Sequence, residues 1–140
     1  MGHYVSVRGW IECDKSNFSA IEKVIDKYRM DFLKYSISQE IAELYQKGWQ
    51  IPKDVINWTA YVFYGADIRQ YNLDFIKDQI IEIGKIDEDI RAYFFIDDDE
   101  NIENYNWKLL EGVLLEFQRE NIEQYLSDKW LKKWENLLIL

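Results

Sequence analysis

Near the N-terminus the sequence reads Tyr4-Val5-Ser6-Val7-Arg8-Gly9-Trp10-Ile11. Apolar and polar residues alternate along it, which is typical of a β-strand with one buried face, because successive side chains of a strand point to opposite sides. The alternation predicts that Val5, Val7 and Ile11 face a core. The opposite face of the strand is then formed by Tyr4, Ser6, Arg8 and Trp10.

Three helices are predicted downstream of this strand, because apolar residues recur there at intervals of three and four. The first begins at Ser16, a residue type that caps helices. The second runs from about 38 to 47 and stops at Gly48, and the third begins after Asn72 and stops at Gly84. Their inward-facing positions are expected to be Ile21, Val24, Ile25 and Tyr28, then Ile41, Leu44 and Tyr45, then Phe75, Ile76, Ile80 and Ile83.

Four further strands are predicted from β-branched and aromatic residues. The first of them is Asn57 to Tyr64. The segment from Ile90 to Ile96 is apolar almost throughout, which predicts a central strand that is buried on both faces. Tyr105 to Leu110 and Val113 to Gln118 flank the pair Glu111-Gly112, whose glycine suits a tight hairpin turn.

A last helix is predicted from about 121 to 138, with Ile122, Leu126, Trp130, Trp134 and Leu137 at helical spacing, as on a core-facing side. The element order is therefore β-α-α-β-α-β-β-β-α. This order favours a single α+β domain over residues 1–140, with a mainly antiparallel sheet of about five strands. The helices are expected to pack largely on one face of the sheet, and the last three strands to form a meander.

The chain carries 26 acidic and 17 basic residues, a net charge of −9, and all of the excess lies in its second half. The densest part is the segment from Asp87 to Glu103, where eight acidic residues accompany one basic residue, Arg91. Its second portion, Asp97 to Asn104, is expected to be an exposed loop between two strands. Because nucleic-acid binding requires a broad positive surface, direct binding of DNA or RNA is disfavoured.

The remaining composition predicts a cytoplasmic protein without a membrane span. There is no export signal at the N-terminus, no apolar run of about 20 residues, and only one cysteine, Cys13, so that no intramolecular disulfide can form. Cys13 lies between Glu12 and Asp14. Neighbouring carboxylates raise the pKa of a thiol, which favours a packed, unreactive Cys13.

No catalytic, metal-binding or cofactor-binding motif is found, so we expect a protein that is not an enzyme and has no cofactor. The sole histidine, His3, lies at a terminus and is interpreted as incidental. A calcium loop starting at Asp97 fails, because Ile102 and Lys108 replace its glycine and glutamate. A looser cation site in the acidic run stays open as an alternative.

Two candidate partner-binding surfaces follow from the acids and aromatics. Aromatic anchors surrounded by charge are typical of tight protein interfaces, while a purely solubilising charge run is the alternative. The first surface is the acidic loop with the aromatic residues after it, namely Asp97, Asp98, Asp99, Glu100, Glu103, Tyr105 and Trp107. The second is the sheet face that carries Arg8 and Trp10, if no helix covers it.

The chain resembles the immunity proteins of bacterial polymorphic-toxin and contact-dependent growth inhibition systems. The resemblance lies in the overall plan and in three stretches, His3-Tyr4-Val5-Ser6-Val7-Arg8-Gly9-Trp10-Ile11-Glu12, Trp58-Thr59-Ala60-Tyr61-Val62-Phe63-Tyr64 and Arg91-Ala92-Tyr93-Phe94-Phe95-Ile96-Asp97-Asp98-Asp99-Glu100. It implies a stoichiometric inhibitor that binds a cognate toxin domain, commonly a basic nuclease, and masks its active site or substrate groove. The alternatives are a small enzyme of another type and an acidic DNA-mimic or regulatory binding protein.

Overall fold

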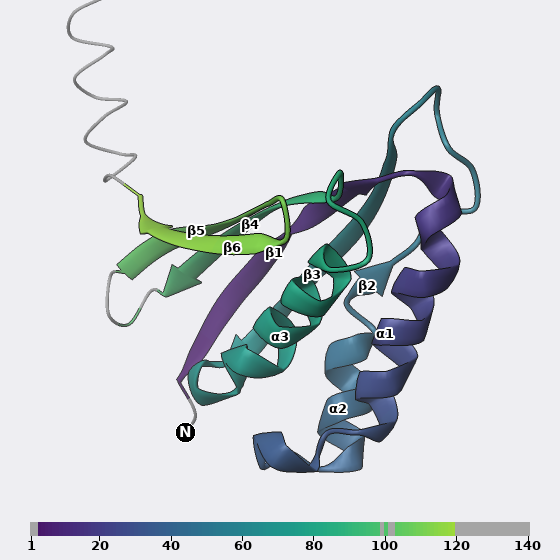
Figure 1. Ribbon diagram of the computed structural model, residues 1–140. Coiled ribbons are helices and arrows are strands. Elements are labelled where there is room, and N and C mark those ends of the chain that lie inside the picture. The colour runs from purple at the N-terminus through teal and green to yellow at the C-terminus, as the bar shows by residue number, and fades with distance from the viewer. Residues whose placement is uncertain (1–2, 99, 101–102, 120–140) are drawn as a thin grey trace, which may run out of the picture.

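Figure 1 shows the computed structural model, in which residues 3–98, 100 and 103–119 are described. The helices are α1 (Phe18–Met30), α2 (Gln39–Gln46) and α3 (Leu73–Gly84). The strands are β1 (Tyr4–Cys13), β2 (Trp49–Gln50), β3 (Ala60–Arg69), β4 (Arg91–Asp98), β5 (Glu103–Leu110) and β6 (Val113–Gln118). The helix predicted over 121–138, with Trp130 and Trp134, lies outside the described residues.

All neighbouring strands of the single sheet are antiparallel, in the order β2-β3-β1-β4-β5-β6. The predicted α+β class is confirmed, and so is the meander of the last three strands. The sheet has six strands instead of about five, because the two-residue β2 pairs with β3 through Trp49 and Gln50. Two residues are too few to produce a periodicity that a sequence pattern reveals.

The three helices cover one face of the sheet, and the core lies between the two layers (Figure 1). Val5, Val7 and Ile11 of β1 point into this core, as their alternation predicts. The helices contribute the predicted stripe residues of α1 and α3, all of which are buried. The core therefore has one sheet side and one helix side, and it draws on every described helix.

Several local predictions are wrong. Ser16 does not cap α1, because Asp14 caps a short 3-10 turn that contains Ser16, and α1 begins at Phe18. Leu44 is exposed, since the buried positions of α2 are Ala42, Tyr45 and Gln46. Strand β3 begins three residues later than predicted and continues to Arg69, because β1 pairs with it along its whole length.

Strand β4 lies next to β1 in the middle of the sheet, as predicted, but only one of its faces is fully buried. Ala92, Phe94 and Ile96 point into the core, whereas Tyr93 and Phe95 are half-buried on the opposite face. None of the three described helices lies on that opposite face, which we call the open face. Register places Phe63, Trp10 and Tyr93 side by side across it.

Candidate functional site

Strand β4 divides the acidic segment into two groups. Asp87, Glu88 and Asp89 lie just before the strand, and Asp97 and Asp98 form its last two residues. A strand of this length spans about 25 Å at roughly 3.3 Å per residue. The two groups of acidic residues in this segment therefore lie at opposite ends of the sheet.

The carboxylates at the far end of β4 are bound within the fold. Asp97 accepts hydrogen bonds from the guanidinium groups of Arg8 and Arg119. Asp98 is only 4% exposed, and its Oδ1 lies 2.5 Å from Nε2 of His3. Glu100 is exposed, with its Oε2 3.8 Å from the same histidine nitrogen. The expectation of an exposed acidic loop is thus wrong for Asp98, and Asp97 is already paired with two cations.

The aromatic residues proposed to accompany this loop belong to the core side of the sheet. Trp107 is 1% exposed, and its Nε1 donates a hydrogen bond of 2.8 Å to Oε1 of Glu116. Tyr105 is half-buried and packs against the core. Trp107 is therefore a core residue and cannot act as an exposed anchor. Asp99 and the side chain of Glu103 lie outside the described residues.

His3 holds the start of β1 against the end of β4 and is not incidental to the structure. Its carbonyl accepts a hydrogen bond from the backbone N–H of Gln70 at 2.8 Å. The hydrogen bond between its ring and Asp98 raises the pKa of His3, and the charges of Asp98 and Glu100 add to this effect.

We expect the NMR titration of His3 to give a pKa above 6.5, the ordinary value, because Asp98 favours the protonated ring. A raised pKa means that this contact stabilises the fold fully below the unfolded-state pKa and that the contribution disappears as pH rises through the folded-state pKa. The Asp98→Asn variant should move the pKa of His3 back toward its ordinary value. An equal pKa in the two proteins would disprove the contact.

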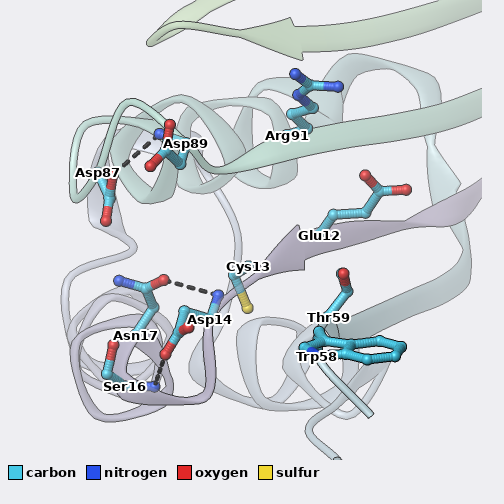
Figure 2. A pocket seen from close by; sticks show the side chains of 10 residues that line it. All are labelled: Glu12, Cys13, Asp14, Ser16, Asn17, Trp58, Thr59, Asp87, Asp89 and Arg91. Atoms are coloured by element: carbon cyan, nitrogen blue, oxygen red, sulfur yellow. Dashed lines mark hydrogen bonds between the residues drawn. The ribbon is translucent and has the colours of Figure 1, made fainter. Parts of the chain in front are cut away.

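The opposite end of the sheet holds a depression of about 680 Å³, which we call the acidic depression. Figure 2 shows that its walls come from the end of β1, the turn before α1 and the loops that precede β3 and β4. Its lining residues are Glu12, Cys13, Asp14, Ser16, Asn17, Trp58, Thr59, Asp87, Asp89 and Arg91. Four carboxylates and one guanidinium therefore converge from segments that are distant in the sequence.

Backbone turns fix two of these carboxylates. Asp14 Oδ1 accepts a hydrogen bond of 2.9 Å from the backbone N–H of Ser16. Hydrogen bonds from the backbone and the side chain of Ser16 lower the pKa of the Asp14 carboxyl group. Asp87 Oδ1 accepts the N–H of Asp89 at 2.9 Å in the turn before β4. Among residues 3–98, 100 and 103–119, no ion pair includes a carboxylate of the acidic depression. The negative charge of the acidic depression is therefore available to an external cation.

An apolar groove adjoins the acidic depression and shares Thr59 with it. It is lined by Pro52, Asp54, Val55, Ile56, Thr59, Ala60, Tyr61 and Phe63. Ile56 is 84% exposed, and Trp58, which lines the depression itself, is 86% exposed. The rings of Tyr61 and Phe63 stack at 6.4 Å on the open face. Large apolar side chains that gather in one exposed region mark interaction surfaces.

The second predicted surface, around Arg8 and Trp10, lies on the open face and continues toward this groove. Trp10 is half-buried, with its ring 5.8 Å from that of Tyr93 and 6.2 Å from that of Phe95. Phe63 is its register neighbour on β3. Arg8 is exposed, but its guanidinium group is paired with Asp97. Trp10 is the member of the pair that lies next to Phe63, a residue of the apolar groove.

Cys13 lies in the wall of the acidic depression but is buried. Burial, and secondarily the charge of Asp14, raises its pKa to about 11. The interpretation of Cys13 as a packed thiol is thus confirmed. At pH 8 the folded protein should react with a disulfide reagent about 100-fold more slowly than the urea-unfolded chain, because the thiolate is the reactive form. Equal rates in the two states would show that Cys13 is accessible.

The described residues contain no group of three His, Cys, Asp or Glu side chains that is arranged to hold a metal ion. No described helix combines the length and the apolar character needed to cross a membrane. Comparison of the chain with models of protein families, with curated proteins and with solved structures finds no match. The chemistry of the candidate site therefore has to be inferred from its own residues.

Sequence reasoning missed this site because its members meet only through strand pairing. Glu12 and Arg91 are register partners on β1 and β4, which brings the Asp87–Asp89 turn beside the end of β1. The available signal was the density of acid immediately before a strand. The sequence does not show which strand end lies beside this acidic turn, because that depends on the pairing of β1 with β4. Trp58 was assigned to a strand, whereas it precedes β3 in a loop.

Proposed function

We propose that the chain is an immunity-type protein, which binds a basic toxin domain stoichiometrically in the cytoplasm and blocks its active site or substrate groove. One observation carries this proposal. Exposed aromatic and apolar side chains lie beside carboxylates that have no cationic partner among the described residues. Trp58 and Ile56 supply the apolar part, and Glu12, Asp87 and Asp89 supply the charge.

The aromatic side chains give such a surface its affinity. Trp and Tyr are enriched among the few interface residues that contribute most of the binding free energy. Trp58 lies on a loop, while Tyr61 and Phe63 extend from β3, whose backbone is fixed by β1 along its whole length. A rigid strand presents its side chains at low entropic cost, which favours tight binding.

The carboxylates give the surface its preference for a basic partner. Opposite charges increase the rate of encounter and orient the two proteins before contact. A nuclease groove is built to hold phosphates, so the carboxylates of the acidic depression can occupy the same cationic positions and keep the substrate out. Because Asp97 and Asp98 are bound within the fold, the acids beside β1 fulfil this role better than the acids of the β4–β5 loop.

The test is neutralisation of a specific toxin domain. We expect the gene for this chain to lie immediately downstream of one that encodes a large secreted protein, and the C-terminal domain of that protein is then the domain to use. Cells that express the domain alone should stop growing, and cells that also express this chain should grow. Purified chain and domain should form a one-to-one complex. Failure of the chain to bind or to restore growth would overturn the proposal.

The role of charge is tested with the triple variant Glu12→Gln, Asp87→Asn and Asp89→Asn. Asparagine at 87 keeps an oxygen that can accept the Asp89 N–H, so the turn is retained. Association with the toxin domain at low salt should slow by about 10-fold, because electrostatic steering is reduced. The control Asp31→Asn, Glu40→Gln and Glu43→Gln removes the same charge from exposed positions on the helix side. Equal slowing in both variants would show that only net charge matters.

A further inference from the structure

The sheet ends in two edge strands, β2 on one side and β6 on the other. An edge strand presents unpaired backbone N–H and C=O groups, and native proteins commonly shorten such strands or place Pro or Lys in them. Strand β2 has only two residues, with Pro52 just after it. Strand β6 has six residues and contains neither Pro nor Lys. The β6 edge therefore lacks the features that prevent pairing with a further strand.

The backbone of β6 uses every second residue to pair with β5. The N–H of Arg119 donates to the carbonyl of Asn104 at 2.9 Å, which fixes the residues that turn toward β5 as those two, four and six positions before Arg119. The residues of β6 that direct their N–H and C=O groups away from the sheet are then Leu114, Glu116 and Gln118. Among the described residues no strand pairs with this outer edge.

The side chains that β6 places on the open face are apolar. Val113, Leu115 and Phe117 are 56%, 49% and 46% exposed. They lie on the open face, because their register partners on β5 alternate with the buried Trp107. Glu116, the one charged residue of β6, lies on the helix side, where its carboxylate accepts the hydrogen bond from Trp107. An exposed apolar strip therefore runs along the unpaired edge.

We propose that two copies of this chain pair through their β6 strands, antiparallel and about a two-fold axis at Leu115, so that their sheets become one continuous sheet. In this register Leu114 lies opposite Glu116 of the second copy, and the outward N–H and C=O groups of both residues form backbone hydrogen bonds. Leu115 lies opposite its own counterpart, and Val113 lies opposite Phe117. The apolar strips of the two copies then adjoin on one face of the joined sheet.

Strand length and charge select this register. The middle of β6 falls between Leu115 and Glu116, so an axis at either residue gives the longest pairing. An axis at Glu116 would place two carboxylates directly opposite each other, which is destabilising. An axis at Leu115 separates these carboxylates and sets the exposed Glu111 of each hairpin turn across from Arg119 of the other copy. The charges of the edge are therefore complementary to a second copy in this register.

A second copy suits this edge better than an unrelated strand, because the edge is complementary to itself and two-fold contacts repeat every favourable pair twice. The pairing uses none of the residues that line the acidic depression or the apolar groove. Each copy can therefore still bind one toxin domain. The inference goes beyond the proposed function and needs no toxin partner, so each can fail without the other.

Sedimentation equilibrium of the full-length chain tests the pairing. The average mass should rise from that of one chain toward that of two, with a dissociation constant on the order of 10 µM, because the contact is small. Glu116→Pro removes an outward N–H and should weaken the association by at least about 10-fold. The control Glu116→Ala loses the same side-chain contact but keeps the N–H, so it should associate as the original chain does. A single-chain mass at every concentration, or equal weakening in both variants, would overturn the proposal.

Disulfide cross-linking in chains that carry Cys13→Ala tests the register without disturbing the backbone. Leu115→Cys should give a cross-linked dimer under mild oxidation, because Cα atoms directly opposite in a non-hydrogen-bonded pair lie about 4.5 Å apart, within disulfide range. Val113→Cys is the matched control on the same face, and the two substituted positions would lie about 13 Å apart along the strands, too far for a disulfide. Equal cross-linking of both variants would contradict this register, and cross-linking of neither would contradict the pairing.

Discussion

The Gly9→Ala variant is expected to lose about 3 kcal/mol of the free energy of unfolding, at the upper end of the range for overpacked cores. Gly9 lies in β1 between β3 and β4, opposite Tyr64 and Phe94. A Cβ atom at this position would lie 2.7 Å from Cα of Phe94 and would also meet the carbonyl oxygen of Tyr93. Backbone atoms in the middle of a sheet cannot move aside as the end of a flexible side chain can, so the strands would have to separate. Urea unfolding measures the loss.

Gly65→Ala is the matched control for Gly9→Ala. Gly65 pairs with Arg8 on the neighbouring strand β3, and a Cβ atom there would meet nothing within 4 Å. We therefore expect the control to change stability by less than about 0.5 kcal/mol. Equal stability of the two variants would contradict the close approach of β1 and β4 that brings Glu12 beside the Asp87–Asp89 turn.

Trp58→Ala should weaken binding of the toxin domain by about 100-fold, which corresponds to about 3 kcal/mol. Trp58 lines the acidic depression, and its 86% exposure in the free protein leaves a large aromatic surface to be buried by a partner. Most of the loss should appear as faster dissociation, since interface side chains act mainly on the lifetime of a complex. Surface plasmon resonance gives both rates.

Leu33→Ala is the control for Trp58→Ala, because Leu33 is 79% exposed but lies in the 3-10 turn after α1, on the helix side. Neither substitution should lower the melting temperature appreciably, as neither side chain is packed. If Leu33→Ala weakened binding as strongly as Trp58→Ala, the partner would be contacting the helix layer instead of the aromatic and acidic end of the sheet.

The fold was predictable where a pattern is local. Alternation in β1 identified Val5, Val7 and Ile11 as core residues, and helical spacing identified the buried side of α3. The turn at Glu111-Gly112 was predictable because glycine adopts positive φ without strain, and Gly112 has a φ of 75° in the structure. Strand β2 was not predictable, because two residues are too few to show the alternation of apolar and polar side chains that marks a strand.

The candidate site was predictable only in part, because charge density along a chain is not charge density in space. The segment from Asp87 to Glu103 is acidic along the chain, but β4 lies between its two groups of acidic residues and places them at opposite ends of the sheet. Asp97 and Asp98 are bound by Arg8, Arg119 and His3, which lie far from them in sequence. The partners of a side chain depend on strand pairing, which a single sequence does not specify.

Hydrogen exchange with mass spectrometry, applied to the free chain and to its complex with the proposed toxin partner, tests the location of the binding site most directly. Backbone amides in residues 52–63 and 85–91 should exchange more slowly in the complex, because these segments form the apolar groove and the Asp87–Asp89 turn. Amides of α2 should be unchanged. Slower exchange confined to residues 97–107 or to the helices, with 52–63 and 85–91 unaffected, would contradict recognition by the aromatic and acidic end of the sheet.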